Sequence, residues 1–391
     1  MTTFFAFDEL TWPEVADLPR SIPLVLPLGS GYARDDLARA LGGPPRVGLL
    51  PPLPYGWSAS SVSVPERVLC PFLANLLDCL EADGFARAVA VVPSGCDLGL
   101  GERQIALSAR PEEQGEEEPL IDGRVAIVPF GHTEQHGYHL PLSTDTLIID
   151  AIARGITAAV PDQAIALPTL PYGVSTHRAS FAGTFNAGGR AFEDLCSAVI
   201  DALVARGCDQ ICLISGYGGN VSFLVNAIKY AGERHRRIFC ATSWLYLCGP
   251  MGAAALAARR RSPVGGMGHT CELETSLLLH LRPDLVRLER AVDEMDFIAT
   301  PAYFMDWIEG GALIANPPWD DDDTITGAYG APRLAIAENG RFWLEAAIAE
   351  KITHVAEIRE QQTRREQRRR AGYGLWGRSA LPVRRPSDLF V

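Results

Sequence analysis

Four side chains that commonly bind metal ions stand close together in the stretch GHTEQHGYHLPLSTD, residues 131–145. They are Glu134, His136, His139 and Asp145, and they follow the apolar run VAIVPF. A catalytic zinc site uses about three imidazole or carboxylate ligands and leaves one position for water. Glu134 and His136 can face the same side of an extended loop, because side chains alternate. Asp145 can return across the loop and bridge two ions. The stretch therefore predicts a metal site whose remaining ligand lies elsewhere in the chain.

Two other short stretches combine polar residues with turn signals. SGYGGN, at 215–220, is a Gly-rich turn that could cradle a phosphate, but Val221 stands where a dinucleotide-binding pattern needs its third glycine. GHTCELETS holds His269, Glu272 and Glu274 just before an apolar run. Its ELETS could be an ordinary helix start, since carboxylates are favoured in a first helical turn. A helix start would explain one of the two glutamates, but it explains less well why both occur together with His269.

Strand-like apolar runs alternate with helical patterns through the second third of the chain. The runs VAIVPF and QICLIS are separated by the helical patterns TLIIDAIARGITAAV and AFEDLCSAVIDALVARG. This alternation predicts an α/β fold, in three layers, with a mainly parallel sheet between helices. Ligands bind beyond the carboxyl ends of such strands. The stretch 131–145 begins at one of these ends.

The first hundred residues repeat the pattern of the second third in a shorter form. LVLPLGSGY (24–32) aligns with AIVPFGHTE, and LLPPLPYGWS (49–58) aligns with IALPTLPYGVS through a shared LPYG. LLDCLEADGFARAVAVVPSG (76–95) then follows the pattern of ALVARGCDQICLISGYGG. The first copy lacks the equivalent of QHGYHLPLSTD and carries Tyr32 at the position of Glu134. The alternative is two unrelated α/β segments that share turn chemistry.

Composition shifts divide the chain into four parts. Residues 1–110 are expected to be a truncated copy without a site, and 111–122, which include EEQGEEEP, an acidic linker. Residues 123–355 are the expected catalytic domain. Residues 356–391 form a basic C-terminal tail containing QQTRREQRRR. The interpretation that requires no function is a solvated helix end followed by an extension that packs on a neighbour.

The overall composition describes an ordinary globular protein. The chain has 391 residues, 47% of them hydrophobic and 21% charged, and its net charge of -12 argues against a nucleic-acid binder. The sequence shows neither a signal-peptide pattern nor an apolar run long enough to span a membrane, so we expect a cytoplasmic protein without membrane contact. The nine cysteines, mostly in apolar runs, are expected to be buried thiols without disulfides.

Five sequence blocks, in order, resemble the creatininase family of metal-dependent hydrolases, which act on amide and related C–N bonds. The blocks are PFGHTEQHGYHLPLSTD, LPYGVSTHRASFAGTF, SGYGGN, GHTCELETS and TGAYGAPRLAIAENG. The N-terminal ELTWPEV also resembles the usual start of the family, although here it lies on the shorter first copy. The resemblance implies the fold and the activity of this family.

The resemblance also assigns roles to residues. Glu134, His136 and Asp145 match metal ligands, with Asp145 as the bridge, and Glu134 is also an expected catalytic carboxylate. His269 matches an acid/base histidine near the substrate, and Glu274 matches the glutamate that follows it. The expected substrate-binding residues are Trp244, which resembles an aromatic that closes over the substrate, His177, Tyr172 and Gly218. For His177 the alternative is a turn histidine bonded to the backbone.

One departure from the family falls on a metal ligand. Members typically read N-G-H-G-x-N, so Tyr217 replaces the histidine, and Gly219 stands where creatininase itself has a glutamate. A phenol has a reference pKa near 10 and would lose its proton to a metal only at a cost in affinity. Three outcomes are open. Tyr217 ligates a strongly Lewis-acidic metal, one ion is held by His136, Asp145 and Glu272, or the site is degenerate.

The leading hypothesis is an amidohydrolase that uses one or two divalent ions, Zn or Mn, with Fe possible. Metal-activated water would cleave a small cyclic amide or a peptide while His269 carries a proton to the leaving nitrogen. We expect a homo-oligomer. The alternative is a family member with a structural or assembly role and no hydrolysis, favoured by Tyr217 and the first copy. A thiol enzyme using Cys271 and His269 is a further alternative, but no third orienting group is evident.

Overall fold

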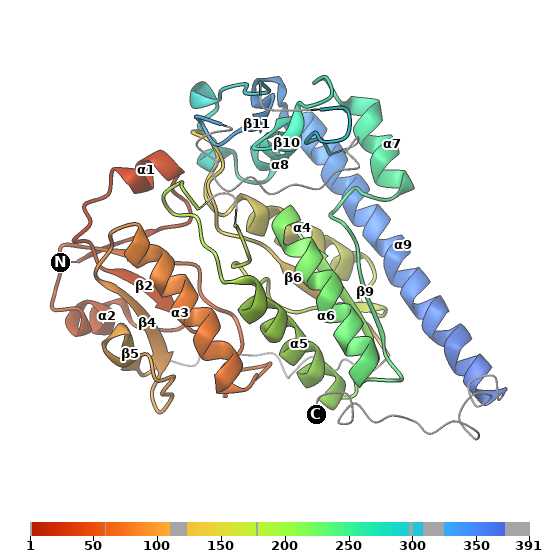
Figure 1. Cartoon of the computed structure of the whole chain (residues 1–391), viewed down its shortest axis with the longest axis horizontal. Coiled ribbons are helices and arrows are strands. Elements are labelled where there is room, and N and C mark those ends of the chain that lie inside the picture. The colour runs from red at the N-terminus through yellow and green to blue at the C-terminus, as the bar shows by residue number, and fades with distance from the viewer. Residues whose placement is uncertain are drawn as a thin grey trace.

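The protein contains two parallel sheets that lie next to each other and have helices on both sides (Figure 1). This computed structural model describes residues 2–58, 60–109, 123–176, 179–296, 300–307 and 324–371. The expected α/β class and the mainly parallel, helix-flanked sheet are confirmed.

The first sheet is built from residues 2–109, here called the first unit. Its strands are β1 (Thr3–Ala6), β2 (Leu24–Pro27), β3 (Arg46–Leu49), β4 (Ala88–Pro93) and β5 (Gln104–Leu107), paired in parallel in the order β1-β3-β2-β4-β5. Its helices are α1 (Trp12–Ala16), α2 (Arg34–Ala40) and α3 (Glu66–Ala82). Leu24 and Leu26 join the core with α3, whereas Val25 joins the core with α2, so β2 is covered on both faces.

The second sheet and its helices are built from the residues after 122, here called the second unit. The strands β6 (Val125–Phe130), β7 (Ala164–Ala166), β8 (Gln210–Ser215) and β9 (Phe239–Thr242) pair in parallel in the order β7-β6-β8-β9. The helices are α4 (Thr144–Ala159), α5 (Gly189–Ala205), α6 (Val221–Arg234), α7 (Pro250–Arg259), α8 (Glu272–Leu281) and α9 (Ala337–Arg370). Two short antiparallel strands, β10 (Met267–His269) and β11 (Tyr329–Gly330), lie between α7 and α9 in the chain.

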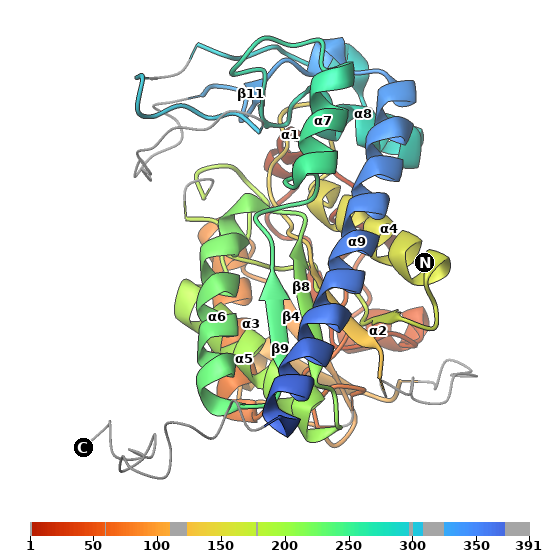
Figure 2. The same ribbon diagram turned by 90° about the vertical axis from the view of Figure 1, so that its right-hand side faces the viewer.

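The central strand β6 is buried on both faces. Val128 and Phe130 point into the core shared with α5, and Val125 and Ile127 point into the core shared with α4, α8 and α9. Figure 2 shows α5 and α6 on one side of β8 and β9 and α9 on the other. The segment carrying α7, α8, β10 and β11 lies beyond the carboxyl ends of these strands (Figures 1 and 2). The loop after β6 therefore runs toward this segment of the second unit.

The two sheets share a strand order. β3-β2-β4-β5 of the first unit corresponds to β7-β6-β8-β9 of the second, and the sequence alignment pairs β2 with β6, β3 with β7 and β4 with β8. Such an order is also common among unrelated doubly wound sheets. The duplication and the four-part division of the chain therefore stay predictions.

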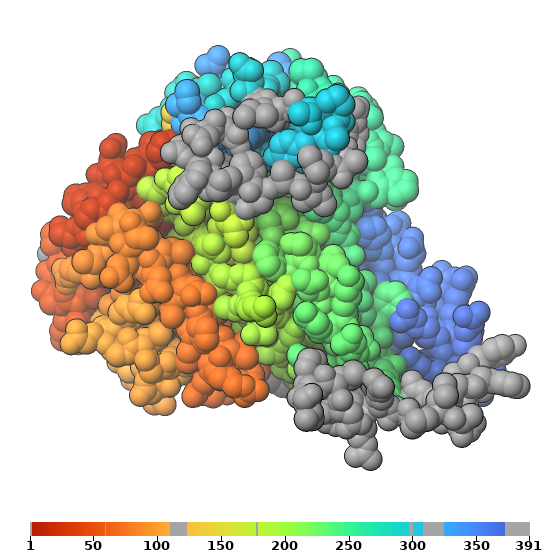
Figure 3. Space-filling model, viewed as in Figure 1, coloured from red at the N-terminus to blue at the C-terminus, as the bar shows by residue number. Residues whose placement is uncertain are grey.

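The two units are joined through helices α3 and α5, which lie side by side (Figure 1) and contribute to one hydrophobic core. Asn75 donates a hydrogen bond to the carbonyl of Ala187 at 2.7 Å, and the Tyr172 hydroxyl donates to the carbonyl of Pro51 at 2.7 Å. The surfaces of the two units meet without a break on the face drawn in Figure 3. The first unit is thus an integral part of the core of the second.

Residues 8–10 of the first unit also hold the loop that leads into α4. The backbone N–H of Leu142 donates to the Leu10 carbonyl at 2.9 Å, and that of Ser143 donates to the Asp8 carbonyl at 3.0 Å. Trp12 follows in the same segment and donates its indole N–H to the Thr326 carbonyl at 3.0 Å. The first unit therefore holds two segments of the second unit: the loop that leads into α4 and the segment just before β11.

The C-terminal helix extends further than the expected domain boundary. α9 continues through residue 355 to Arg370, and Ile358 and Gln362 on the extension are buried. The boundary drawn at 355 thus falls inside one helix. The expected linker 111–122 and residues 372–391 of the expected tail lie outside the described residues.

Within the described ranges, no helix is both long enough and apolar enough to cross a membrane.

Replacing Asp8 by Asn should stabilise the protein at alkaline pH. Burial, with a smaller contribution from Glu9, raises the pKa of Asp8 from 3.8 to about 6. Because the folded-state pKa lies above the unfolded value, the favourable contribution of the protonated carboxyl is lost as pH rises through 6. The Asp8→Asn variant should therefore exceed wild type in free energy of unfolding by about 2 kcal/mol at pH 8, and the difference should shrink as pH falls towards 4. Denaturant melts at several pH values measure this. A difference that is constant with pH would contradict it.

Candidate metal centre

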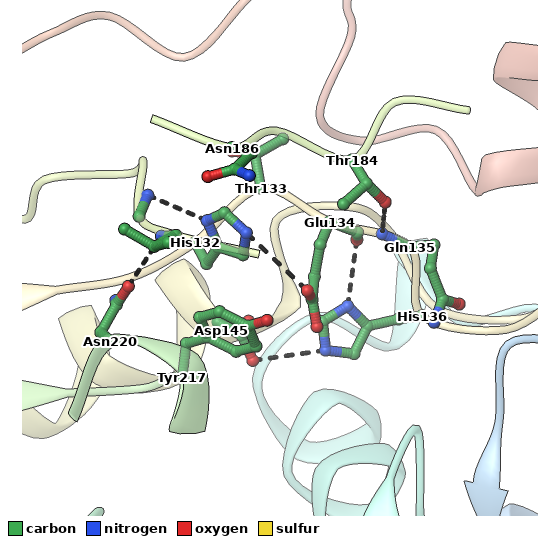
Figure 4. Close-up of polar contacts among 12 residues, drawn as sticks. His132, Thr133, Glu134, Gln135, His136, Asp145, Thr184, Asn186, Tyr217 and Asn220 are labelled. Carbon is green, nitrogen blue, oxygen red and sulfur yellow. Dashed lines mark hydrogen bonds and ion pairs between the residues drawn. The ribbon is translucent and has the colours of Figure 1, made fainter. Parts of the chain in front are cut away.

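Five of the residues singled out from the sequence meet in one buried cluster at the carboxyl ends of β6 and β8. Glu134 and His136 come from the loop after β6, Asp145 from the first turn of α4, His269 from the end of β10, and Glu274 from the first turn of α8. Their side chains are almost inaccessible to solvent, and His269 is the most exposed at 7%. Figure 4 shows Glu134, His136 and Asp145 pointing toward one another.

The cluster contains two groups of potential metal ligands that share His136. In the first, Glu134, His136 and His269 offer ligand atoms within 4.8 Å of one another. In the second, His136, Asp145 and Glu274 do the same. Each group has the nitrogen and oxygen donors that suit Zn²⁺ or Mn²⁺.

The hydrogen bonds of His136 fix which of its nitrogens can bind a metal. Its Nδ1 lies 3.1 Å from the Glu134 carbonyl, which can only accept, so Nδ1 carries the proton. Nε2 then presents a lone pair, and it faces Asp145 Oδ1 at 3.3 Å. Two acceptors at this distance repel each other unless a cation or a proton lies between them. The other carboxylate oxygen of Asp145, Oδ2, is buried and has no hydrogen-bond partner in the described part of the chain.

The carboxylates of the cluster are held in an environment that disfavours negative charge. Burial raises the pKa of Asp145 well above its usual range. Burial also raises the pKa of Glu274, where the nearby Asp145 adds to the rise and His136 opposes it. Buried carboxylates of this kind need a proton or a bound cation for compensation. A divalent ion would supply it for both at once.

His269 and Glu134 form the second contact of the cluster. His269 Nε2 lies 3.0 Å from the backbone carbonyl of Gln135, an acceptor, and 3.1 Å from the side-chain nitrogen of Gln135, a donor, so these contacts fix the position of the ring but not its tautomer. The other ring nitrogen, Nδ1, faces Glu134 Oε1 at 3.5 Å. The Gln135 side chain is anchored in turn by its amide, which donates to the Gly327 carbonyl at 2.8 Å. The imidazole is thereby directed at the carboxylate.

Backbone geometry at the turn between β10 and α8 brings His269 and Glu274 to the same space. Thr270 has a φ of 54°, a left-handed conformation that is costly for a β-branched residue. The turn allows Cys271 to cap α8, and the Cys271 N–H donates to the Glu274 carboxylate at 3.3 Å. Strain at this position indicates a site that the surrounding fold enforces.

Asn220 ties together the loops that surround the cluster. Its Nδ2 donates to the Gly131 carbonyl at 3.1 Å, and its Oδ1 accepts the Val174 N–H at 3.1 Å (Figure 4). A side chain at Gly173 would collide with Asn220, since a Cβ there would lie 2.0 Å from Oδ1. The SGYGGN turn by itself predicted no role for Asn220. Its position at the end of that turn was the available signal.

Other residues predicted from the sequence lie outside the cluster. Both carboxylate oxygens of Glu272 accept the Arg261 N–H, and Oε2 also accepts the Ser262 N–H at 2.7 Å, so this side chain is turned away. Tyr172 is fully buried and reaches the first unit through its hydroxyl. Gly218 begins the short 3₁₀ turn Gly218–Asn220. Trp244 lies after β9 and is 57% exposed, and His177 lies outside the described residues.

His139, the fourth metal-binding side chain of the stretch 131–145, has a different task. Its Nε2 lies 2.9 Å from the Thr275 hydroxyl. Burial, and to a lesser extent the neighbouring His136, lowers the pKa of His139 to about 3. The side chain is therefore a neutral hydrogen-bonding group that connects the loop to α8.

Tyr217 lies flat against the imidazole of His132. The two ring centroids are 4.4 Å apart with an interplanar angle of 18°, and Figure 4 shows the pair beside Asp145. A Cβ at Gly219 would lie 2.4 Å from Cε1 of Tyr217, so the ring fills the space of a side chain at 219. The two departures from the family pattern are thus physically coupled.

Known proteins resemble the second unit. A family model for creatininase, creatinine amidohydrolase, matches residues 113–355, more than half of the chain. The chain belongs to the creatininase family. A mycofactocin precursor peptide peptidase of Mycobacterium ulcerans (strain Agy99) is 30% identical over 240 residues, covering 59% of this chain and 84% of that protein. The creatinine amidohydrolase of Pseudomonas putida is 29% identical over 246 residues, covering 57% and 85%.

Solved creatininase structures share the fold of this chain. A manganese form is 25% identical with a TM-score of 0.50 and covers 60% of this chain and 91% of that one. A variant of Zn–Zn type is 25% identical with the same TM-score and covers 60% and 90%. This chain is accordingly a creatininase-family amidohydrolase, a hydrolase of amide C–N bonds. The family match begins after the first unit.

The loop that carries Trp244 in this creatininase-family chain is held by a buried ion pair of α9. Lys351 Nζ donates to the Ser243 hydroxyl at 2.9 Å and to the Leu245 carbonyl at 2.8 Å, on either side of Trp244. The adjacent Glu350 carboxylate accepts the N–H groups of Gly249 and Gly252 at the start of α7 and lies 3.9 Å from Lys351 Nζ. The backbone on both sides of the exposed Trp244 is therefore held in place by α9.

Replacing Lys351 by Met should loosen this loop. The substitution leaves the Leu245 carbonyl and the Glu350 carboxylate without their buried cation, so the free energy of unfolding should fall by about 3 kcal/mol. Amide hydrogen exchange at residues 243–249 should accelerate more than elsewhere. Lys229→Met, on the exposed surface of α6, is the matched control and should change neither quantity. Unchanged exchange in the Lys351 variant would contradict the assigned role.

Proposed function

We propose that this chain holds one divalent ion, Zn²⁺ or Mn²⁺, through His136, Asp145 and Glu274, and uses it to hydrolyse a C–N bond. The observation that carries the proposal is the 3.3 Å approach of His136 Nε2 to Asp145 Oδ1. Ligands bonded to a tetrahedral zinc at about 2.0–2.2 Å are separated by about 3.4 Å. The spacing of this lone pair and this buried carboxylate is therefore the spacing of two ligands of one metal ion, whereas in direct contact the two acceptors would repel each other.

One ion accounts for the residues better than two. A second ion would need ligands where the family has a histidine and creatininase has a glutamate, and Tyr217 and Gly219 stand there instead. The ring of Tyr217 stacks on His132 and fills the space above Gly219. Glu134 and His269 are then available for proton transfer. Glu272, considered from the sequence as a ligand of the single ion, is replaced in this proposal by Glu274.

The remaining residues can carry the protons of the reaction. A divalent ion held by His136, Asp145 and Glu274 would lower the pKa of water and polarise a substrate carbonyl. Glu134 accepts the proton of the attacking water, and His269, 3.5 Å from Glu134, receives it and delivers it to the leaving nitrogen. The Gln135 carbonyl keeps His269 oriented during both transfers. Burial of the cluster strengthens each of these electrostatic interactions.

The substrate is proposed to be a small cyclic amide or a peptide. The relatives support both classes, since one is a peptide peptidase and one a creatinine amidohydrolase. Trp244, whose side chain is mostly exposed, is the proposed aromatic cover for either substrate. The homo-oligomer expected from the family stays a prediction. A thiol mechanism is disfavoured, because burial raises the pKa of Cys271 and leaves its thiol protonated.

Substitution of a proposed ligand should lower the metal content of the protein, whereas substitution of a nearby carboxylate outside the cluster should not. Asp145→Asn should lose the ion and lower kcat on lactams or short peptides by more than about a thousandfold, since a buried ligand is removed. Glu272→Gln should keep its metal and lose mainly thermal stability, because its carboxylate supports the 261–262 backbone. Elemental analysis and a hydrolysis panel on wild type and both variants measure this. A wild type without metal or activity would favour the structural or assembly role instead.

A further inference from the structure

His132 is the one histidine of the buried site that the sequence analysis did not consider. Its imidazole is fully buried, and its Nε2 lies 3.7 Å from Oε2 of Glu134 (Figure 4). The opposite oxygen of the same carboxylate, Oε1, faces His269 at 3.5 Å. Glu134 is therefore held between two imidazoles, one on each oxygen.

The backbone determines the tautomer of His132. Gly173 donates its N–H to Nδ1 of His132 at 2.9 Å, so Nδ1 must carry a lone pair. The neutral ring then has its proton on Nε2, on the side of Glu134. A neutral imidazole protonated at Nε2 cannot ligate a metal through that atom, whereas it can hold a carboxylate in its ionised form.

Tyr217 fixes the plane of this imidazole. The two rings stack at 4.4 Å, and Gly219 provides the room that the phenol ring requires. Gly173, which sets the tautomer, is itself locked against Asn220. Residues from three loops therefore determine the direction of one N–H group.

We propose that His132 is a positioning residue that holds Glu134 toward His269, and that Tyr217 serves as the support of His132 and not as a metal ligand. The proposal rests on the proposed function, in which Glu134 accepts the proton of water. In this arrangement a stacked pair at positions 132 and 217 orients Glu134 by directing the Nε2–H dipole of His132 at Oε2, 3.7 Å away. The replacement of the family histidine at 217 then changes the role of Glu134 without making the site inactive.

Two substitutions of His132 test the roles of its two ring nitrogens individually. Gln places an amide N–H near the position of Nε2, whereas Asn keeps an acceptor near the position of Nδ1 and cannot reach Glu134. The metal-loaded Asn variant should keep wild-type metal content and the wild-type visible spectrum with Co²⁺. Its kcat should fall about tenfold to a hundredfold with little change in KM, and the Gln variant should recover most of the loss.

A crystal structure of the metal-loaded His132→Asn variant gives a readout that does not depend on turnover. We expect the Glu134 carboxylate to move away from His269, beyond the 3.5 Å seen in wild type. Loss of metal or an altered Co²⁺ spectrum in either variant would make His132 a ligand and overturn the proposal. An unmoved Glu134 would overturn it as well. A wild type that binds no metal would instead refute the proposed function, and the Glu134 position in the metal-free variant would still decide the role of His132.

Discussion

The approach of His136 Nε2 to Asp145 is the contact on which the organisation of the site depends. His136 Nδ1–H donates to the Glu134 carbonyl, so Nε2 presents a lone pair 3.3 Å from a buried carboxylate, an arrangement that is unfavourable unless a cation or a proton lies between them. Asp145 starts α4, and His136 lies in the loop that the first unit holds through Leu142 and Ser143. The packing of both units thus keeps two mutually repelling acceptors in place. In the proposed function, the binding of an ion between them offsets this cost.

Around this contact, the backbones of neighbouring segments approach each other closely. The loop after β8 approaches the first turn of α4 so closely that a Cβ at Gly216 would lie 2.3 Å from the Asp145 carbonyl. Asn220 bridges the loops after β6 and β8, where the rings of Tyr217 and His132 stack on each other. Because the ligands and the orienting groups come from different loops, a substitution at one position shifts the requirements at the others. The combination of Tyr217 with Gly219 is one example of this dependence.

The sequence predicted the α/β class and most of the cluster, for physical reasons that can be identified. β6 and β8 are buried along their whole length and mostly apolar because both faces are covered, and parallel strands bring their following loops to one edge. The direction of Glu272 could not be predicted, because residues two apart on a helix point about 200° apart and the partner backbone at 261–262 is set by the tertiary fold. The tautomer of His132 depends on Gly173, a residue distant in sequence. A basic composition suggested a solvated tail after residue 355, but it does not prevent one face of a helix from packing, as Ile358 and Gln362 do on α9.

The central claim, that a metal ion lies between His136 and Asp145, is tested most directly by anomalous diffraction from crystals of the full chain grown with Mn²⁺ or Zn²⁺. The account predicts one anomalous peak within bonding distance, about 2.0–2.2 Å, of both His136 Nε2 and Asp145 Oδ1, with Glu274 as the third protein ligand. Full occupancy elsewhere in the protein, or density that shows His136 and Asp145 sharing only a proton in the presence of excess metal, would contradict it.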